Sequence, residues 1–176
     1  MKIIDNIKSN RIELISSSAT HIRIELETPH LLAAKLNSIV SEDWPTGEYD
    51  RDAMSFFLSC FESGGKAVEG WYGWYAINID TVSGERSLVG SGGYFGPPDD
   101  KGTVEIGYSV LPEWQRLGFA KEIVIALVSH ALSFKNTKSI IAHTSPENEA
   151  SKRVLISSGF RETGVSEDNL RFEHVR

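Results

Sequence analysis

The segment VEIGYSVLPEWQRLGFAKE, residues 104–122, decides the fold and contains the first candidate site. Its first part alternates apolar with polar or small residues, which predicts a β-strand over residues 103–111. Its second part opens the most strongly periodic helix of the chain, predicted over residues 118–134. One stripe of that helix carries Phe119, Ile123, Leu127 and Ala131.

The turn between this strand and this helix is a candidate anion-binding site. The first amides of a helix have no acceptor inside the helix, and the helix dipole favours negative charge in front of them. Gly118 and Ala120 would allow close approach of a phosphate, and Arg116 would add a charged donor. No Gly-Lys-Ser/Thr or Gly-x-Gly-x-x-Gly pattern is present. An ordinary strand-to-helix turn remains the alternative at this point.

A second block, HTSPENEASKRVLISSGF at residues 143–160, follows that helix. The first block resembles the acetyl-CoA-binding motif of the GNAT acyltransferases, a strand followed by Gln/Arg-x-x-Gly-x-Gly/Ala and a helix. The second is similar to the Asn-x-x-Ser-x-x-Val-Leu-x-x-x-Gly-Phe signature of the ribosomal-protein N-terminal (alanine/serine) acetyltransferases. The resemblance covers residues 86–160. It implies an α+β, three-layer GNAT fold, with a mixed, mostly antiparallel sheet of about seven strands flanked by helices.

The same resemblance implies acetyl-CoA as cosubstrate and assigns residues to it. Loop amides would hold the pyrophosphate, and the preceding strand would pair with the pantetheine arm. Asn148 would contact pantetheine, although an asparagine there equally suits a helix N-cap. The implied cofactor-binding residues are Val110, Leu111, Gln115, Arg116, Leu117, Gly118, Phe119, Ala120, Lys121 and Asn148.

Two residues are the candidate catalytic groups. Glu105 stands between apolar strand residues and should point to the opposite face, where a carboxylate needs a partner or solvent. The resemblance implies that it deprotonates the amine; a salt-bridged or surface glutamate is the alternative. Ser151 lies one turn after Asn148, and the resemblance implies that it donates a proton to the departing thiolate. A plain helix serine is its alternative, and Leu155 occupies the position at which many relatives carry a tyrosine acid.

We expect one domain over residues 1–176, with residues 1–80 on the acceptor side and residues 86–160 binding acetyl-CoA. Thr20 is the expected cap of the first helix. Further strands are expected near residues 12–14 and over 71–79, 86–95, 139–143, 160–165 and 170–175, and further helices over 20–27, 31–36, 50–61 and 148–158.

Composition excludes several classes of protein. A net charge of −6 argues against a nucleic-acid binder. Cys60 is the single cysteine, so an internal disulfide is excluded, and it is expected to be a core thiol. The five histidines show no metal spacing, and no metal is expected. With neither a signal peptide nor a long apolar run, a cytoplasmic protein without membrane contact is expected.

The leading functional hypothesis is an N-acetyltransferase in which an amine attacks acetyl-CoA directly in a ternary complex. The acceptor would be a protein N-terminus or a small-molecule amine, and the oligomeric state, monomer or homodimer, is left open. The alternative is a catalytically silent acyl-CoA-binding sensor, which would keep the loop without needing the acid and base. A third interpretation is nucleotide binding through the same loop.

Overall fold

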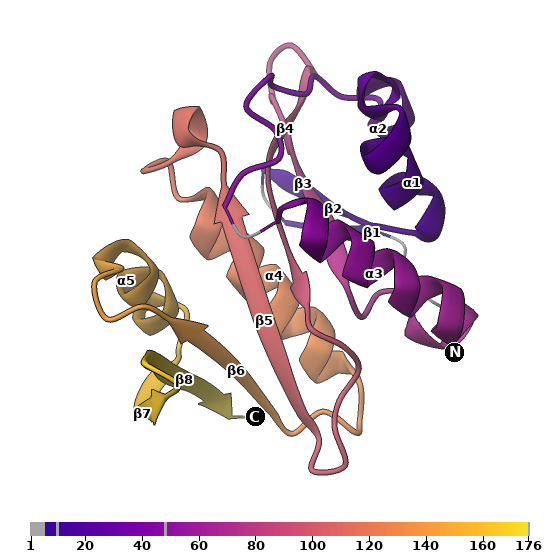
Figure 1. Ribbon diagram of the computed structural model, residues 1–176. Helices are drawn as coiled ribbons and strands as arrows, with labels where there is room; N and C mark the ends of the chain where they lie inside the picture. The colour runs from indigo at the N-terminus through magenta and orange to yellow at the C-terminus, as the bar shows by residue number, and fades with distance from the viewer. Residues whose placement is uncertain (1–5, 10, 48, 176) are drawn as a thin grey trace.

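The computed structural model describes residues 6–9, 11–47 and 49–175. Its strands are β1 (Asn6–Lys8), β2 (Ile12–Ser16), β3 (Gly73–Ile79), β4 (Arg86–Tyr94), β5 (Thr103–Val110), β6 (Ser139–Thr144), β7 (Arg161–Ser166) and β8 (Asn169–Val175). Its α-helices are α1 (Ala19–Glu27), α2 (Leu32–Leu36), α3 (Arg51–Gly64), α4 (Phe119–Ser133) and α5 (Glu149–Ser157). Short 3₁₀ turns cover Pro29–Leu31, Gly65–Val68 and Pro112–Trp114. Figure 1 shows their arrangement.

The strands form one mixed sheet in the order β1-β2-β3-β4-β5-β6-β8-β7. Neighbouring strands are antiparallel except β5 and β6, which are parallel because α4 forms the crossover between them. The expected mixed, mostly antiparallel sheet is therefore confirmed. Among the described residues it has eight strands rather than about seven, because β1 has only three residues, too few to show a periodic pattern in the sequence.

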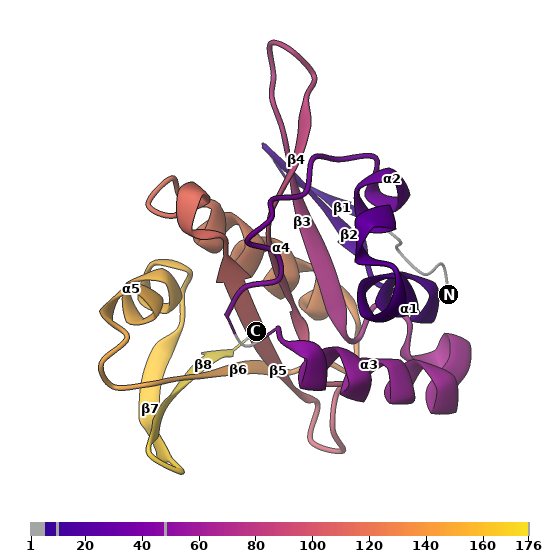
Figure 2. The ribbon, with the colours of Figure 1, turned by 45° about the horizontal axis from the view of Figure 1, so that its top comes forward.

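Helices cover the two faces of this sheet separately. The strands send alternate side chains to opposite faces, so that Trp74 packs with Ile123 and Leu127 of α4, whereas Tyr75 packs with Leu32 and Leu36 of α2. Figures 1 and 2 show α1 to α3 grouped beside the β1–β4 half of the sheet and α5 beside β6 and β8. The layered architecture thus follows from the two-residue period of the strands.

The pairing between β5 and β6 is short, and this feature positions the site. The two strands pair only over Thr103–Glu105 and Ser139–Ile141. β5 nevertheless continues to pair with β4 as far as Val110, and β6 with β8 as far as Thr144. Beyond Glu105 the two strands diverge, as Figure 1 shows, and the edge of β5 facing β6 has no strand partner in the described part of the chain.

Side-chain caps fix the starts of the main acceptor-side helices. Asp50 is the N-cap of α3 and accepts a hydrogen bond from Ala53 N at 2.9 Å. The expected cap of the first helix, Thr20, is wrong: α1 begins at Ala19, and Ser18 is the N-cap. Cys60, expected in the core, is half-buried on α3.

His130 is buried in α4 and shows how packing shifts a titrating group. Its Nδ1 lies 2.8 Å from Tyr94 Oη, and its ring packs edge-on against Trp74 and Phe134. Burial lowers the pKa of His130 to about 4. A neutral imidazole is therefore part of the folded state.

The free energy of unfolding should fall as the pH drops from about 6.5 to about 4, because unfolded histidine binds a proton that folded His130 does not. His130→Gln should remove about 1–3 kcal/mol of this pH dependence, measured by urea unfolding at several pH values. Burial also lowers the pKa of His21 to about 4, so the part of the pH dependence that comes from His21 should remain in this variant. His30→Gln, at an exposed histidine, is the control. An unchanged pH dependence in the His130 variant would contradict this assignment.

Candidate active site

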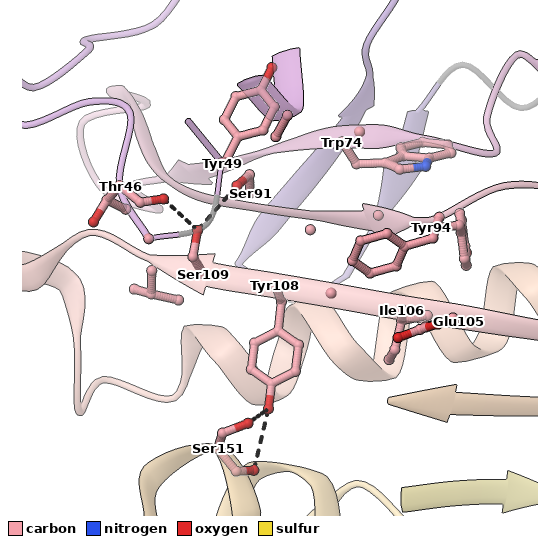
Figure 3. Close-up of a pocket in the computed structure, with 18 of the residues that line it drawn as sticks. Thr46, Tyr49, Trp74, Ser91, Tyr94, Glu105, Ile106, Tyr108, Ser109 and Ser151 are labelled. Atoms are coloured by element: carbon pink, nitrogen blue, oxygen red, sulfur yellow. Dashed lines mark hydrogen bonds between the residues drawn. The ribbon is translucent and has the colours of Figure 1, made fainter. Parts of the chain in front are cut away.

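A cavity of about 770 Å³ opens where β5 and β6 diverge. Its walls are formed by strands β3 to β6, the first turn of α5, the first half of α3, and Thr46, Gly47 and Tyr49. Figure 3 shows part of this lining. Its polar and charged lining includes Tyr49, Asp52, Glu105, Tyr108, His143 and Ser151.

The hydrogen bonds of β5 determine which of its backbone groups face the gap. Phe95 N donates to Glu105 O at 3.1 Å, and Leu111 N donates to Val89 O at 2.9 Å. Because hydrogen-bonded positions alternate along an antiparallel pair, the odd-numbered residues of β5 bond to β4. The peptide groups of Tyr108 and Val110 therefore point towards the gap.

The backbone groups of Val110 and Leu111 point in different directions, although both residues were expected to present backbone to pantetheine. Leu111 uses its N–H on Val89 and accepts from Trp114 N at 2.9 Å, and it is fully buried. Both of its backbone groups are thus engaged within the protein. Val110 faces the gap, where its carbonyl accepts a hydrogen bond from Gln115 Nε2 at 3.1 Å.

The turn before α4 presents a row of unused amides. Arg116 and Gly118 have positive φ angles of 62° and 88°, which turn the chain sharply into the helix. Within the described chain, no backbone N–H from Arg116 through Lys121 donates to another protein group. The first that does is Glu122 N, to Gly118 O at 3.2 Å. The turn therefore has the donor set that an anion requires.

Arg11, which no pattern in the sequence indicated, holds this turn from the start of β2. Its Nη2 donates to Leu117 O at 2.8 Å, and its Nε donates to a Glu122 carboxylate oxygen at 2.7 Å. The guanidinium also lies over the ring of Phe119, 4.5 Å from its centroid. A contact between segments so far apart in the chain leaves no local signal in the sequence.

Glu105 is paired with His143. The carboxylate Oε1 lies 2.7 Å from His143 Nδ1, and both side chains line the cavity. Glu105 is paired in register with Ile141, so His143 lies two residues further along β6 on the same face, just beyond the last strand pair. No role was predicted for His143; a polar residue in the apolar strand 139–143 was the available signal.

Ser151 has a partner that the sequence did not suggest. Its Oγ lies 2.9 Å from Tyr108 Oη, which reaches from β5 to α5 (Figure 3). Burial raises the pKa of Tyr108, so that its hydroxyl is protonated at neutral pH. Asn148 Oδ1 accepts from Ser151 N at 3.0 Å and caps α5. Leu155, at the position of the tyrosine acid in many relatives, is fully buried in the core.

The buried side chain of Glu25 holds two tyrosines that line the cavity, Tyr49 and Tyr75. Glu25 of α1 accepts hydrogen bonds from Trp44 Nε1 at 2.8 Å and from Tyr49 Oη and Tyr75 Oη, each at 2.6 Å. Burial raises the pKa of Glu25, whereas these three hydrogen bonds lower it. Glu25 thereby ties the segment that carries Tyr49 to α1 and β3.

Neither a metal centre nor a membrane-spanning helix is found in the described part of the chain. No three His, Cys, Asp or Glu side chains there lie close enough together to hold a metal ion. None of its helices has the length and apolarity needed to cross a bilayer.

Comparison with known sequences identifies related proteins. A family model described as an acetyltransferase (GNAT) domain matches residues 23–161, well over half of the chain. The uncharacterized N-acetyltransferase YjdG of Bacillus subtilis (strain 168) is 23% identical over 154 residues, which cover 88% of each chain.

Solved structures show the same fold at low sequence identity. RimL, a ribosomal L7/L12 alpha-N-protein acetyltransferase in complex with coenzyme A, gives a TM-score of 0.65 at 14% identity over 97% of both chains. A point mutant of the spermidine N-acetyltransferase SpeG from Vibrio cholerae gives a TM-score of 0.59 at 16% identity, over 92% of this chain and 94% of that one.

Replacement of Glu25 tests its role in the wall of the cavity. Glu25→Ala should lower the free energy of unfolding by about 2–5 kcal/mol, because three buried donors lose their acceptor. Glu25→Gln should cost less, since an amide oxygen remains. Because burial raises the folded pKa of Glu25, wild type should gain stability over the Gln variant as the pH falls towards 4.5. Denaturant unfolding measures both, and exposed Glu27→Ala on the same helix is the control. A cost in Glu25→Ala no larger than in that control would contradict the role.

Proposed function

Because this chain belongs to the GNAT acetyltransferase family, we propose that it transfers an acetyl group from acetyl-CoA to a primary amine by direct attack in a ternary complex. One observation carries the proposal. The open edge of β5 and the paired Glu105 side chain line one cavity, and Gln115, which also lines it, leads directly into the unused amides before α4.

The described residues fit acetyl-CoA in this orientation. Donors from Gln115 to Lys121 would hold the pyrophosphate, with charge added by Arg116 and Lys121. Val110 would pair with the pantetheine arm. For this, its carbonyl must give up the hydrogen bond from Gln115 and accept one from the ligand instead. Asn148 Oδ1 is used by the cap, so its amide nitrogen is the group left for pantetheine. Leu111 would contribute its side chain and the shape of the turn rather than backbone hydrogen bonds.

The chemistry requires a neutral amine and a stabilised leaving group. Amines are largely protonated at neutral pH, so a base must remove a proton before attack. We assign the removal of this proton to the side chains at the end of the cavity that holds Glu105. Acetyl-CoA supplies the thioester; as the new C–N bond forms, the C–S bond breaks. The linked hydroxyls of Ser151 and Tyr108 would donate a proton to the departing thiolate.

The cavity lining favours a cationic acceptor. Asp52 of α3 and Glu105 of β5 both place carboxylates in the lining, and Tyr49, Phe56 and Phe57 add aromatic surface to it. A protonated amine is attracted to both kinds of group. RimL and SpeG act on a protein N-terminus and on spermidine by their names, and we propose an acceptor of one of these two kinds.

An acceptor screen tests the proposed function. Thiol release from acetyl-CoA is followed with peptides that have free N-termini, with polyamines and with amino acids. We expect release above the hydrolytic background with at least one amine, together with a product heavier by one acetyl group in mass spectrometry. Tight coenzyme A binding without turnover across the panel would instead support an acyl-CoA sensor. Binding of ATP or NAD that coenzyme A does not displace would support a nucleotide-binding protein.

Gly118→Asp should weaken acetyl-CoA binding at least about tenfold, because it adds a negative charge beside the row of amides. Its Cβ would lie 3.3 Å from Arg11 Nη2. Gly84→Asp is the matched control. Gly84 also has a positive φ angle, 73°, but lies in an exposed turn with no atom within 4 Å of an added Cβ. Isothermal titration calorimetry measures both, and equal affinities in the two variants would remove the loop assignment.

A further inference from the structure

We propose that His143, rather than Glu105, takes the proton from the attacking amine, and that Glu105 is a positioning residue that holds the imidazole. The inference rests on the proposed function and names a further catalytic residue within it. The 2.7 Å contact between Glu105 Oε1 and His143 Nδ1, at the mouth of the gap between β5 and β6, carries the argument.

The contact selects one tautomer of the ring. An ionised carboxylate only accepts hydrogen bonds, so the shared proton resides on His143 Nδ1. The lone pair of the neutral imidazole is then on Nε2. Within the described residues no hydrogen bond involves that nitrogen, and the side chain lines the cavity with 24% of its surface exposed. The structure thus leaves a basic nitrogen available to a ligand.

Proton affinity favours the imidazole over the carboxylate. A general base works best when its pKa lies near the operating pH, and imidazoles as a class titrate far nearer to neutrality than carboxylates. A carboxylate bonded to the other ring nitrogen orients the imidazole and stabilises the imidazolium that forms. The Glu105–His143 pair has this arrangement.

Other charged groups surround the pair. On β8, Arg171 is paired in register with His143, and its guanidinium bonds to Glu173 at 3.0 Å. From α3, Asp52 lines the cavity together with the pair. The pH dependence of turnover therefore reflects the Glu105–His143 pair together with these charges. Variants of both Glu105 and His143 are needed to assign the base to one of them.

The proton balance is complete without another reactant. The ammonium form of the acceptor gives one proton to His143 Nε2, and the imidazolium is balanced by the Glu105 carboxylate. The free amine forms the C–N bond, and the C–S bond breaks to release the thiolate. The linked hydroxyls of Ser151 and Tyr108 protonate the thiolate, and the second proton, lost from the nitrogen after attack, returns to that hydroxyl pair through solvent.

A purely structural role is the alternative, in which the Glu105–His143 contact only holds the diverging strands together, as a strut. The variants below separate this structural role from the role of base. His143→Asn keeps an N–H donor near the position of Nδ1, and hence the bond to Glu105, but has no basic nitrogen. His143→Ala removes both and leaves space that added imidazole can enter. Glu105→Gln keeps the imidazole but loses the negative charge. His30→Ala, at an exposed histidine, controls for effects of imidazole on the assay.

With an amine identified in the screen, both His143 variants should lower kcat by roughly 10²–10⁴-fold, with little change in coenzyme A affinity measured by calorimetry. Imidazole should restore turnover to His143→Ala and leave His30→Ala unchanged. Glu105→Gln should lose less, about tenfold, and the acid limb of its pH–rate profile should move to lower pH, because the imidazolium loses the carboxylate that stabilises it. Thermal unfolding of each variant confirms that it is folded.

Near-wild-type turnover by His143→Asn would overturn the proposal and make the contact a strut. A larger loss in Glu105→Gln than in the His143 variants, without imidazole rescue, would return the base role to Glu105. Wild-type protein that binds coenzyme A but acetylates no amine would overturn the proposed function itself, and the role of His143 with it.

Discussion

The end of pairing between β5 and β6 is the constraint on which the site depends. Had the two parallel strands continued to pair beyond Glu105, their backbone groups would have satisfied each other and closed the sheet. Each strand is instead held on its far side, β5 by β4 and β6 by β8. The separation is therefore held from both sides, and it leaves an open strand edge, a cavity and the paired Glu105 and His143 side chains in one place.

The sequence predicted most of the fold because most of its signals are local. Residues 104–122 form the expected strand, turn and helix, and Asn148 caps α5 in the expected position. What could not be predicted depends on contacts between distant segments. Arg11 reaches Leu117, Tyr108 reaches Ser151, and the three donors to Glu25 come from two separate parts of the chain.

The candidate site shows the same division between local and distant information. Spacing placed Glu105 on the correct face of β5, but its partner became evident only from the register of β5 against β6. Similarly, a strand pattern cannot distinguish Val110 from Leu111, because the direction of each peptide group depends on which residues bond to β4. Residue types and family motifs indicate a region, whereas pairing register identifies the atoms.

The contacts of Arg11 with the turn before α4 have a thermodynamic consequence for β1 and β2. Its guanidinium joins the start of β2 to Leu117 and Glu122, so an anion that binds this turn also opposes opening of the β1–β2 pair. Coupling between two such events is reciprocal. Amide exchange in β1 and β2 would therefore slow when the turn is occupied, and the β1–β2 pair would report on occupancy of a site that it does not line.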